Sequence, residues 1–296
     1  MSHSQPATAG FKTWIAGARP RTLPAAIAPV LVGTTLIHTD AMSVNWLNAL
    51  LALGVSLALQ IGVNYSNDYS DGIRGTDENR VGPIRLVASG LATPQAVKRA
   101  ALLTFSIAAA LGLVLAARTS WWLVLVGAAA IAAAWTYTGG SKPYGYQGFG
   151  ELSVFIFFGV VATMGSYYAQ SKQLSWQAFL VSLPMGALAC AILAINNLRD
   201  LPKDQLVGKK TLAVRVGDKN ARLIFVGLLV LAHLAAIAAA LITPRTLITV
   251  ALLPQTYLVA MAVLAGANGK DLIPLLGRVG KLQLYFALGL AVAFIL

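Results

Sequence analysis

Charged residues are scarce in this sequence, and cysteine is almost absent. Only 11% of the 296 residues are charged and the mean hydropathy is +0.72, whereas about 25% of residues are charged in an ordinary soluble domain. The low charge excludes a soluble globular protein and indicates a polytopic membrane protein. The single cysteine, Cys190, lies in an apolar segment. It excludes an intramolecular disulfide framework and is interpreted as a small core residue.

Long apolar stretches without charge are what the sequence has instead. A helix needs about 20 mainly apolar residues to cross a bilayer. Nine stretches approach that length: 22–39, 46–66, 100–117, 120–138, 150–170, 174–197, 223–243, 246–266 and 279–296. The predicted fold class is therefore all-α, with nine transmembrane helices in one domain spanning residues 1–296.

Lysine and arginine collect in alternate loops between these stretches. With the N-terminus on the cytoplasmic side, 19 of the 22 basic residues fall on that side, and the exceptions are Arg118, Lys172 and Arg245. This is the bias that cytoplasmic loops of membrane proteins carry. The net charge of +12 is therefore attributed to topology, and no nucleic-acid partner is expected.

The ten acidic residues are distributed differently, because most of them lie in two clusters. The stretch "NYSNDYSDGIRGTDENRVGPIRL" (64–86) ends the second predicted span, and "NNLRDLPKDQLVGKKTLAVRVG" (196–217) ends the sixth. Residues three and four apart share a helix face. Two polar faces are therefore expected, formed by Asn64, Asn67, Asp68 and Asp71 in the first cluster and by Asn196, Asn197 and Asp200 in the second.

The spacing of Asn64 and Asp68 recurs 132 residues later in Asn196 and Asp200. This recurrence suggests a pseudo-repeat of two helix groups, near 22–138 and 150–266. Gly72 and Gly75 indicate that the first polar helix ends before Asp77. Pro202 is expected to end the other helix, which would place Asp204 in the following loop.

Carboxylates gathered at the membrane boundary repel one another and are costly to desolvate unless a cation lies among them. Mg²⁺ prefers oxygen ligands, and one or two carboxylates usually bind it together with substrate phosphates. Basic residues near both clusters are suited to contacting phosphates: Arg74, Arg80, Arg85, Arg199, Lys203, Lys209 and Lys210. The pattern predicts a site for a diphosphate attached to an apolar tail.

Simpler interpretations account for other residues, and solvated salt bridges at the membrane surface remain the alternative for the clusters themselves. Glu151, Asp218 and Asp271 are interpreted as solvent-facing or capping groups. His233 lies alone in an apolar span and is interpreted as a hydrogen-bonded core residue. The Trp121–Trp122 pair lies at a span boundary, where tryptophan is typical of an interfacial anchor.

Two motifs, "NDYSDGIRGTD" and "NNLRDLPKD", resemble the aspartate-rich motifs of the UbiA superfamily of intramembrane prenyltransferases. Within it, "ARPRTLPAAIAPVLVGT", "RVGPIRLVASG" and "YTGGSKPYGYQGFGELSVFIFFG" are similar to the 1,4-dihydroxy-2-naphthoate polyprenyltransferase branch. The resemblance covers residues 14 to 222. It implies nine transmembrane helices around a central cavity open to the cytoplasm of a bacterial inner membrane.

The resemblance also implies a reaction and its participants. A polyprenyl diphosphate would alkylate 1,4-dihydroxy-2-naphthoate with loss of CO₂, giving demethylmenaquinone in menaquinone biosynthesis, with membrane lipid around the protein. Mg²⁺ would be bound by the five carboxylates Asp68, Asp71, Asp77, Asp200 and Asp204. Asn64, Asn67, Asn196 and Asn197 would bind metal-bound waters or phosphate oxygens. In the third cytoplasmic loop, Lys142 and Tyr144 are candidate catalytic residues, and Tyr137 and Tyr146 are candidate substrate contacts.

Other functions share part of this pattern. A transporter also carries ionisable residues in its helices, but these would be expected near mid-span, whereas here they lie at one side. A CDP-alcohol phosphotransferase binds Mg²⁺ through aspartates, but its sequence pattern is missing here. Prenyltransferases that act on 4-hydroxybenzoate or homogentisate, or that make haem O or chlorophyll, share the aspartate motifs, and only motif similarity separates them from this chain.

Overall fold

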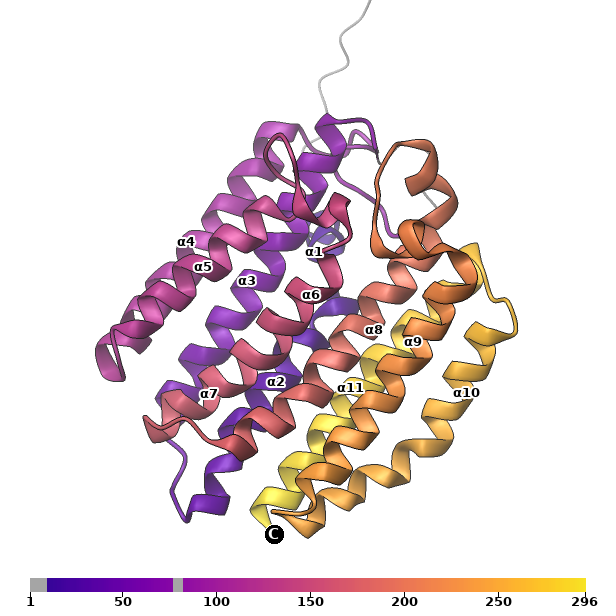
Figure 1. The fold of residues 1–296 in the computed structure, drawn as a ribbon. Coiled ribbons are helices and arrows are strands. Elements are labelled where there is room, and N and C mark those ends of the chain that lie inside the picture. The colour runs from indigo at the N-terminus through magenta and orange to yellow at the C-terminus, as the bar shows by residue number, and fades with distance from the viewer. Residues whose placement is uncertain (1–9, 77–81) are drawn as a thin grey trace, which may run out of the picture.

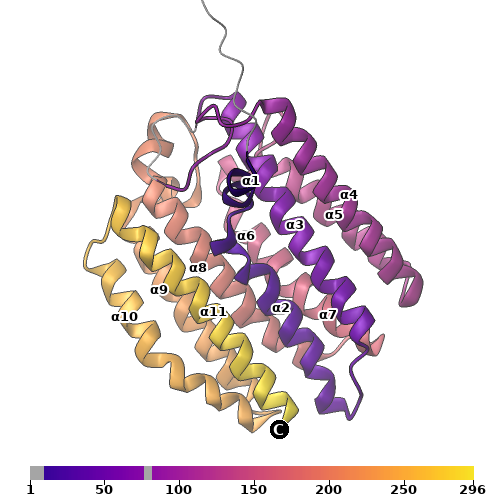
Figure 2. The same cartoon turned by 180° about the vertical axis from the view of Figure 1, so that it is seen from behind.

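The computed structural model describes residues 10–76 and 82–296 of the chain. Within these residues the protein is a bundle of helices without strands (Figures 1 and 2). The all-α fold class is confirmed. Asp77 and Arg80, two of the predicted site residues, lie outside the described residues.

The helices follow one another with short connections. In order they are α1 (Phe11–Ala18), η1 (Pro20–Thr22), α2 (Pro24–Thr35), η2 (Leu36–Asp40), α3 (Trp46–Ile73), α4 (Pro94–Arg118), α5 (Trp122–Thr136), η3 (Tyr144–Gln147), α6 (Gly150–Val154), the π-helical η4 (Phe155–Val161), α7 (Ala162–Ser171), α8 (Trp176–Leu206), α9 (Leu212–Ala239), η5 (Pro244–Leu252), α10 (Leu253–Leu264), η6 (Gly269–Asp271) and α11 (Leu272–Ile295).

Seven helical segments of the described chain are long and apolar enough to cross a membrane. The segments Phe11–Thr22 and Pro24–Asp40 meet at a bend of 54° and give an eighth span if they are counted together. The predicted span at 120–138 corresponds to α5, whose 15 residues fall short of the roughly 20 that a bilayer requires. The structure therefore supports seven or eight spans, and the predicted nine is not confirmed.

The central helix of the bundle is α8, which packs against α2, α7, α9, α11 and η4. Helix η4 approaches α8 closely at two glycines, Gly159 and Gly186. A side chain at Gly159 would not fit, since its Cβ would lie 2.4 Å from the Cα of Gly186. Small residues let helices in a membrane approach closely, where dispersion rather than water exclusion holds them together. A second group, α3 with α4 and α5, packs on the other side of the bundle.

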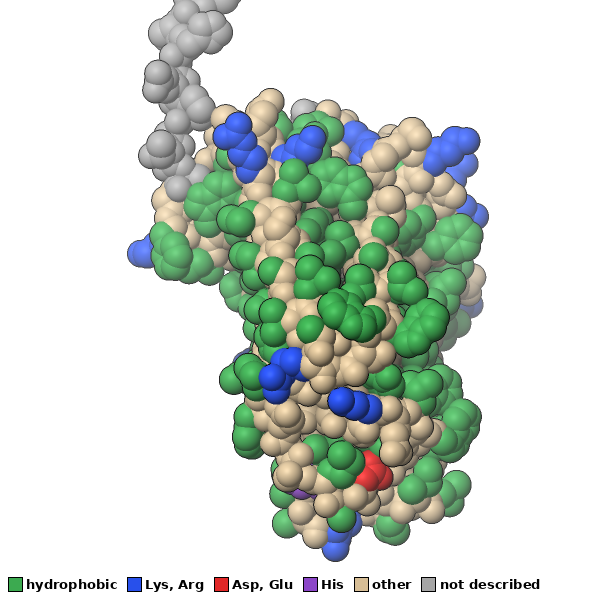
Figure 3. Space-filling view, turned by 90° about the vertical axis from the view of Figure 1, so that its left-hand side faces the viewer, with side chains coloured by type: hydrophobic (Ala, Val, Ile, Leu, Met, Phe, Trp, Pro, Cys, Tyr) green, Lys and Arg blue, Asp and Glu red, His purple; other side chains and the backbone are tan. Residues whose placement is uncertain are grey.

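One end of the bundle carries α1 and the loops that follow α3, α5 and α8, whereas the C-terminus lies at the opposite end (Figure 1). The face in Figure 3 is mainly hydrophobic through its middle, with Lys and Arg gathered near the loop-bearing end. A hydrophobic middle band with basic ends is the surface that a bilayer-embedded protein presents.

The ends of the two motif-bearing helices differ from one another. Helix α3 ends at Ile73, before Asp77, as Gly72 and Gly75 predicted. The prediction for Pro202 is wrong, because α8 continues through this proline to Leu206 and Asp204 lies on the helix, buried. Pro202 removes the hydrogen bond to the carbonyl four residues earlier, and its ring crowds that carbonyl. The burial of Leu201 and Asp204 on either side of it favours the continued helix.

Candidate active site

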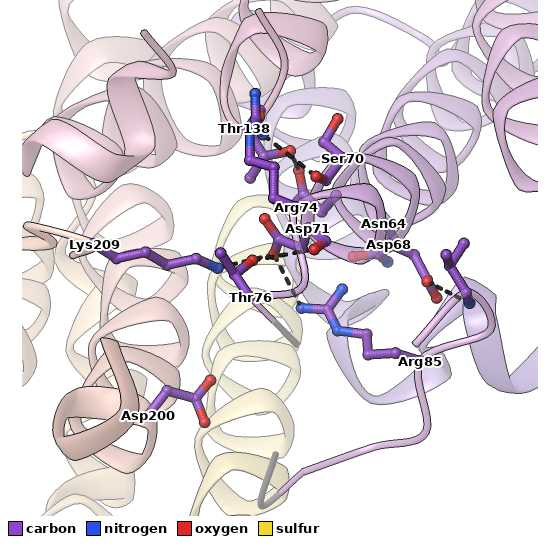
Figure 4. Close-up of polar contacts among 12 residues, drawn as sticks. Asn64, Asp68, Ser70, Asp71, Arg74, Thr76, Arg85, Thr138, Asp200 and Lys209 are labelled. Carbon is purple, nitrogen blue, oxygen red and sulfur yellow. Dashed lines mark hydrogen bonds and ion pairs between the residues drawn. The ribbon is translucent and has the colours of Figure 1, made fainter. Parts of the chain in front are cut away.

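The end of α3 brings Asp71 next to two cationic side chains, Arg85 and Lys209 (Figure 4), and next to Tyr146. Its carboxylate lies 3.2 Å from Lys209 Nζ and 3.8 Å from Arg85 Nη2, and it accepts a hydrogen bond from the Tyr146 hydroxyl. The Lys209 ammonium also lies 4.6 Å from the Tyr146 ring centroid. Burial, followed by the charge of Asp71, raises the pKa of the Tyr146 hydroxyl, so this group stays a proton donor.

Asp68 is held in a different way, although it lies only one turn away on α3. Its two oxygens accept the backbone N–H groups of Leu86 at 2.8 Å and Val87 at 3.1 Å, and its side chain is fully buried. A carboxylate accepting two backbone N–H groups forms strong charge-assisted hydrogen bonds. Asp68 therefore fastens the segment directly after Arg85 to α3, and it does not line the polar chamber described below.

The end of α8 contributes Asp200 and Asp204 from the other side. Arg199 binds its neighbour Asp200 through both oxygens, with Nε–Oδ1 and Nη2–Oδ2 distances of 2.8 Å. The guanidinium also faces Gly82, where a Cβ would lie 3.2 Å from Arg199 Cζ. This contact brings the loop after α3 next to the end of α8.

The loop between α5 and α6 closes a third side. Arg74 donates to the backbone carbonyls of Thr138 and Gly140, and Thr138 Oγ1 donates to Asn67 Oδ1 at 2.8 Å. Tyr144 hydrogen-bonds Ser153 at 2.8 Å, and burial raises the pKa of the Tyr144 hydroxyl. Arg74 thus fastens this loop to α3.

The turn between α1 and α2 supplies residues that sequence reasoning missed. Asn64 Nδ2 donates to the Ala18 carbonyl at 2.9 Å, and Gln60 Nε2 donates to Thr22 Oγ1 at 2.8 Å. Arg19 at this turn has a left-handed backbone, with φ 54°. The Arg-Pro and Thr-Leu-Pro elements of "ARPRTLP" were the available signal, since proline beside arginine marks a turn near the membrane boundary.

Two cavities meet between these elements. A polar chamber of about 550 Å³ is lined by the ends of α3 and α8 and by the loops around them, including Asp71, Arg85, Asp200, Asp204 and Lys209. An apolar chamber of about 500 Å³ extends from it between α2, α3, α4, α5, η4 and α8. The residues that line both chambers define the junction: Arg19, Thr22, Asn67, Tyr137, Leu193 and Asn196.

The oxygen ligands of the polar chamber fit a hard divalent cation. Asp71, Asp200 and Asp204 line it together with the amide groups of Asn67 and Asn196. Among the described residues no three carboxylate, histidine or cysteine side chains already form a metal cluster. Mg²⁺ characteristically takes one or two carboxylates and completes its shell with waters and phosphates, so this donor set suits Mg²⁺ arriving with a diphosphate.

Most of the predicted site residues converge on this chamber, and five of the described ones lie elsewhere, including Asp68, which binds the segment after Arg85. Those that line it are Asn67, Asp71, Arg85, Tyr137, Tyr146, Asn196, Asn197, Arg199, Asp200, Lys203, Asp204 and Lys209. Asn64 and Tyr144 line the apolar chamber instead. Arg74 binds the α5–α6 loop, and Lys142 is exposed outside both linings.

Three single-residue interpretations can be compared with the structure. His233 lies in the core and pairs with Thr256 at 2.9 Å, and Cys190 is buried, so both interpretations are confirmed. Of the two interpretations of Glu151, the solvent-facing one is wrong, whereas its place in the first turn of α6 leaves the capping one open. Its Oε1 accepts a hydrogen bond from Asn197 Nδ2 at 2.8 Å, and its Oε2 is buried. The helix turn that begins α6 directs this side chain against α8 instead of into water.

Known proteins resemble this chain in sequence and in fold. The family model of the UbiA prenyltransferase family matches residues 26–295, and the chain belongs to this family. Its relatives include the 1,4-dihydroxy-2-naphthoate octaprenyltransferase of Mycobacterium tuberculosis, 50% identical over 96% of this chain and 97% of the relative. The enzyme of the same name from Escherichia coli is 42% identical over 71% of this chain and 70% of that enzyme.

Two solved structures share the fold. The apo structure of a UbiA homolog from Aeropyrum pernix K1 superposes with a TM-score of 0.72 at 15% identity, over 90% of this chain and 97% of that one. A UbiA homolog from Archaeoglobus fulgidus, solved bound to GPP and Mg²⁺, gives a TM-score of 0.66 at 14% identity, over 95% and 99% of the two chains.

Proposed function

We propose that this chain is a Mg²⁺-dependent prenyltransferase that joins a polyprenyl group to 1,4-dihydroxy-2-naphthoate with loss of CO₂, giving demethylmenaquinone. The observation that carries the proposal is the junction of a chamber lined by carboxylates and cations with an apolar chamber of similar size. Five relatives at 34–50% identity are named 1,4-dihydroxy-2-naphthoate octaprenyltransferases, which supports this acceptor over 4-hydroxybenzoate or homogentisate.

The chamber residues divide between metal and phosphate. Asp71, Asp200 and Asp204 are the proposed metal ligands, and a metal bound there would act as a Lewis acid that makes diphosphate a better leaving group. Arg85, Lys203 and Lys209 are placed to bind phosphate oxygens, since all of them line the same space. Lys209 neutralises Asp71 before substrate enters, so the ammonium changes partner from carboxylate to phosphate on binding.

The junction is the proposed site of bond formation. The apolar chamber takes the prenyl tail, whose first carbon then lies at the junction beside Tyr137 and Asn67. The allylic carbon–oxygen bond breaks and its electron pair leaves with the diphosphate. The ring carbon that bears the carboxylate supplies the electron pair for the new carbon–carbon bond. Its bond to the carboxylate then breaks, CO₂ leaves, and the electron pair of the broken bond returns to the ring. The aromatic face of Tyr137 is suited to stabilising the cationic carbon.

The orientation in the membrane is part of the proposal. The loop-bearing end of the bundle, with most of the lysines and arginines, faces the cytoplasm of a bacterial inner membrane, where a water-soluble acceptor reaches the polar chamber. Reporter fusions between α3 and α4 and in the turn after Leu206 should both report from the cytoplasm. An outer location for either loop would contradict a shared site.

The decisive experiment supplies purified protein in liposomes with Mg²⁺, a polyprenyl diphosphate and three acceptors in parallel. We expect prenylation of 1,4-dihydroxy-2-naphthoate with one CO₂ released for each product, and no product in the presence of excess chelator. Prenylation of 4-hydroxybenzoate alone would move the chain to another branch of the family. Movement of a solute across the membrane with no product at all would favour a transporter.

A further inference from the structure

Glu151 is an acidic side chain with no role in the reaction described above. It is the second residue of α6, and its segment Gly150–Ser171 is one of the candidate membrane spans. A carboxylate inside a membrane segment is costly and is usually retained for a function. Its carboxylate lies against α8, one helical turn before Asp200, because it is bonded to Asn197.

The contacts of Glu151 define the position of the carboxylate. Its backbone carbonyl accepts a hydrogen bond from Cys190 Sγ at 3.0 Å, and its Oε1 accepts one from Asn197 Nδ2 at 2.8 Å. Oε2 is buried and makes no hydrogen bond with any described residue. The preceding residue, Gly150, lies against the Tyr137 hydroxyl, from which a Cβ would be only 2.8 Å away. Glu151 therefore lies directly behind the wall of the junction.

The bond to Glu151 fixes which end of the Asn197 amide faces the polar chamber. An amide has a donor end and an acceptor end, whereas an ionised carboxylate only accepts. With Nδ2 directed to Glu151, Oδ1 points away from it, and Asn197 lines the polar chamber. Within the described part of the chain, Oδ1 has no protein hydrogen-bond donor.

Asn196 has the same polarity, because its Nδ2 donates to the Ile192 carbonyl at 3.3 Å. Both asparagines thus direct their donors into protein, which leaves neutral oxygens for the chamber that also holds Asp200 and Asp204. Neutral amide oxygens are accepted ligands of hard cations and of the waters around them. Residues that orient such ligands tune metal affinity without touching the metal.

We propose that Glu151 is a positioning residue that holds the Asn197 amide with its oxygen toward the metal–diphosphate chamber. The assignment rests on the proposed function, because it concerns the same chamber. It makes "GFGEL", residues 148–152, a third element of the site beside the two aspartate motifs. Glu151 itself touches neither substrate nor metal and acts through Asn197.

The test measures direct binding of geranyl diphosphate with Mg²⁺ to the purified protein, without acceptor, for Glu151→Ala, Asn197→Ala and the double variant. Each single variant should weaken binding about 10-fold or more, the range typical of residues that orient metal ligands. The double variant should be no weaker than Asn197→Ala, since Glu151 acts through that residue. Multiplying effects in the double variant, or unchanged binding in Glu151→Ala, would overturn the proposal.

Glu151→Gln protects the test against misfolding, because glutamine has nearly the same shape. The glutamine amide can donate as well as accept a hydrogen bond, so the Asn197 amide can rotate and exchange the positions of its oxygen and nitrogen. We expect a loss of about 2- to 5-fold, smaller than for alanine, with thermal unfolding unchanged. Wild-type affinity in Glu151→Gln together with altered unfolding in Glu151→Ala would also overturn the proposal and assign Glu151 a structural role.

A matched control lies at the end of η2, which follows α2. Asp40 also accepts a hydrogen bond from a side chain, Tyr167 at 2.6 Å, and Asp40→Asn should leave binding unchanged. Because binding is measured without acceptor, failure of the proposed function appears separately, as a wild-type protein that binds the diphosphate but does not prenylate 1,4-dihydroxy-2-naphthoate.

Discussion

Helices α3 and α8 each bring carboxylates to one polar chamber from two sides, yet the acidic residues of the two helix ends have different partners. On α3, Asp68 binds backbone N–H groups of Leu86 and Val87, and Asp71 faces Lys209 and Arg85. On α8, Asp200 is paired with the residue before it, Arg199. Two motifs with similar spacing therefore contain one anchoring carboxylate and several that face the chamber.

The difference between the two motifs follows from what packs beside each helix. A chain segment, residues 82–93, runs beside the end of α3 and needs partners for its backbone N–H groups, because a buried N–H without an acceptor costs free energy. The end of α8 packs against helix α6, and Asn197 near this end donates a hydrogen bond to Glu151. Asp68 therefore holds the loop that carries Arg85, whereas Asp200 and Asp204 remain in the chamber lining.

The largest expected effect is at the chamber carboxylates. Asp71→Ala and Asp200→Ala should each lower turnover at least about 1,000-fold, because losing a catalytic metal ligand costs several kcal/mol of transition-state stabilisation. Prenyl transfer should be measured across a Mg²⁺ titration, with membrane insertion checked for each variant. The exposed Asp271→Ala is the control and should match wild type. Near-normal turnover of either variant at low Mg²⁺ would contradict a metal site shared by the two motifs.

Asp68→Asn tests the division within α3. The new NH₂ group cannot accept a backbone N–H, so one of the two bonds is lost, which costs about 1–3 kcal/mol of stability. We expect turnover to fall roughly 10- to 100-fold through displacement of Arg85, together with a lower unfolding temperature and an unchanged Mg²⁺ concentration for half-maximal activity. A strongly increased Mg²⁺ requirement with normal unfolding would show that Asp68 is a metal ligand after all.

Lys209→Met tests the cation that neutralises Asp71. Methionine keeps most of the side-chain volume but removes the ammonium 3.2 Å from the carboxylate. We expect Mg²⁺ alone to bind more tightly, because a competing cation is gone, and Mg²⁺ with geranyl diphosphate to bind about 10-fold more weakly, because a phosphate contact is lost. Both affinities can be measured by calorimetry. The same direction of change for both ligands would contradict a change of partner by Lys209.

The smallest effect is expected outside both motifs, at Tyr144. Burial raises the pKa of its hydroxyl in the folded state, so the stability that depends on the protonated form is present below about pH 10, the unfolded value, and is lost as pH rises through the folded value. Tyr144→Phe has no hydroxyl to ionise. At pH 8 the unfolding temperature of Tyr144→Phe should lie below that of wild type. This difference should shrink between pH 10 and pH 12, because only the wild type loses stability as Tyr144 ionises. A constant or growing difference would be inconsistent with ionisation of Tyr144.

Sequence reasoning predicted the helices well and their ends less well. Apolar length and periodicity are local properties, so a helix was found at each predicted span. The number of full spans was harder to predict, because a bend between η1 and α2 and the short α5 depend on packing. The prediction for Pro202 failed for the same reason, since buried neighbours kept α8 helical beyond it. The pseudo-repeat stays a prediction.

The sequence by itself determined that two helix ends would each carry acidic side chains on one face, because the three- and four-residue spacing places them there whatever surrounds the helix. It could not determine which oxygens remain available. Asp68 and Asp71 differ by three positions on one helix, but their partners come from residues 86–87 and 209. Glu151 meets Asn197 across 46 residues. Only the tertiary structure decided these roles, because hydrogen-bond partners are set by spatial proximity, and no spacing along the chain encodes it.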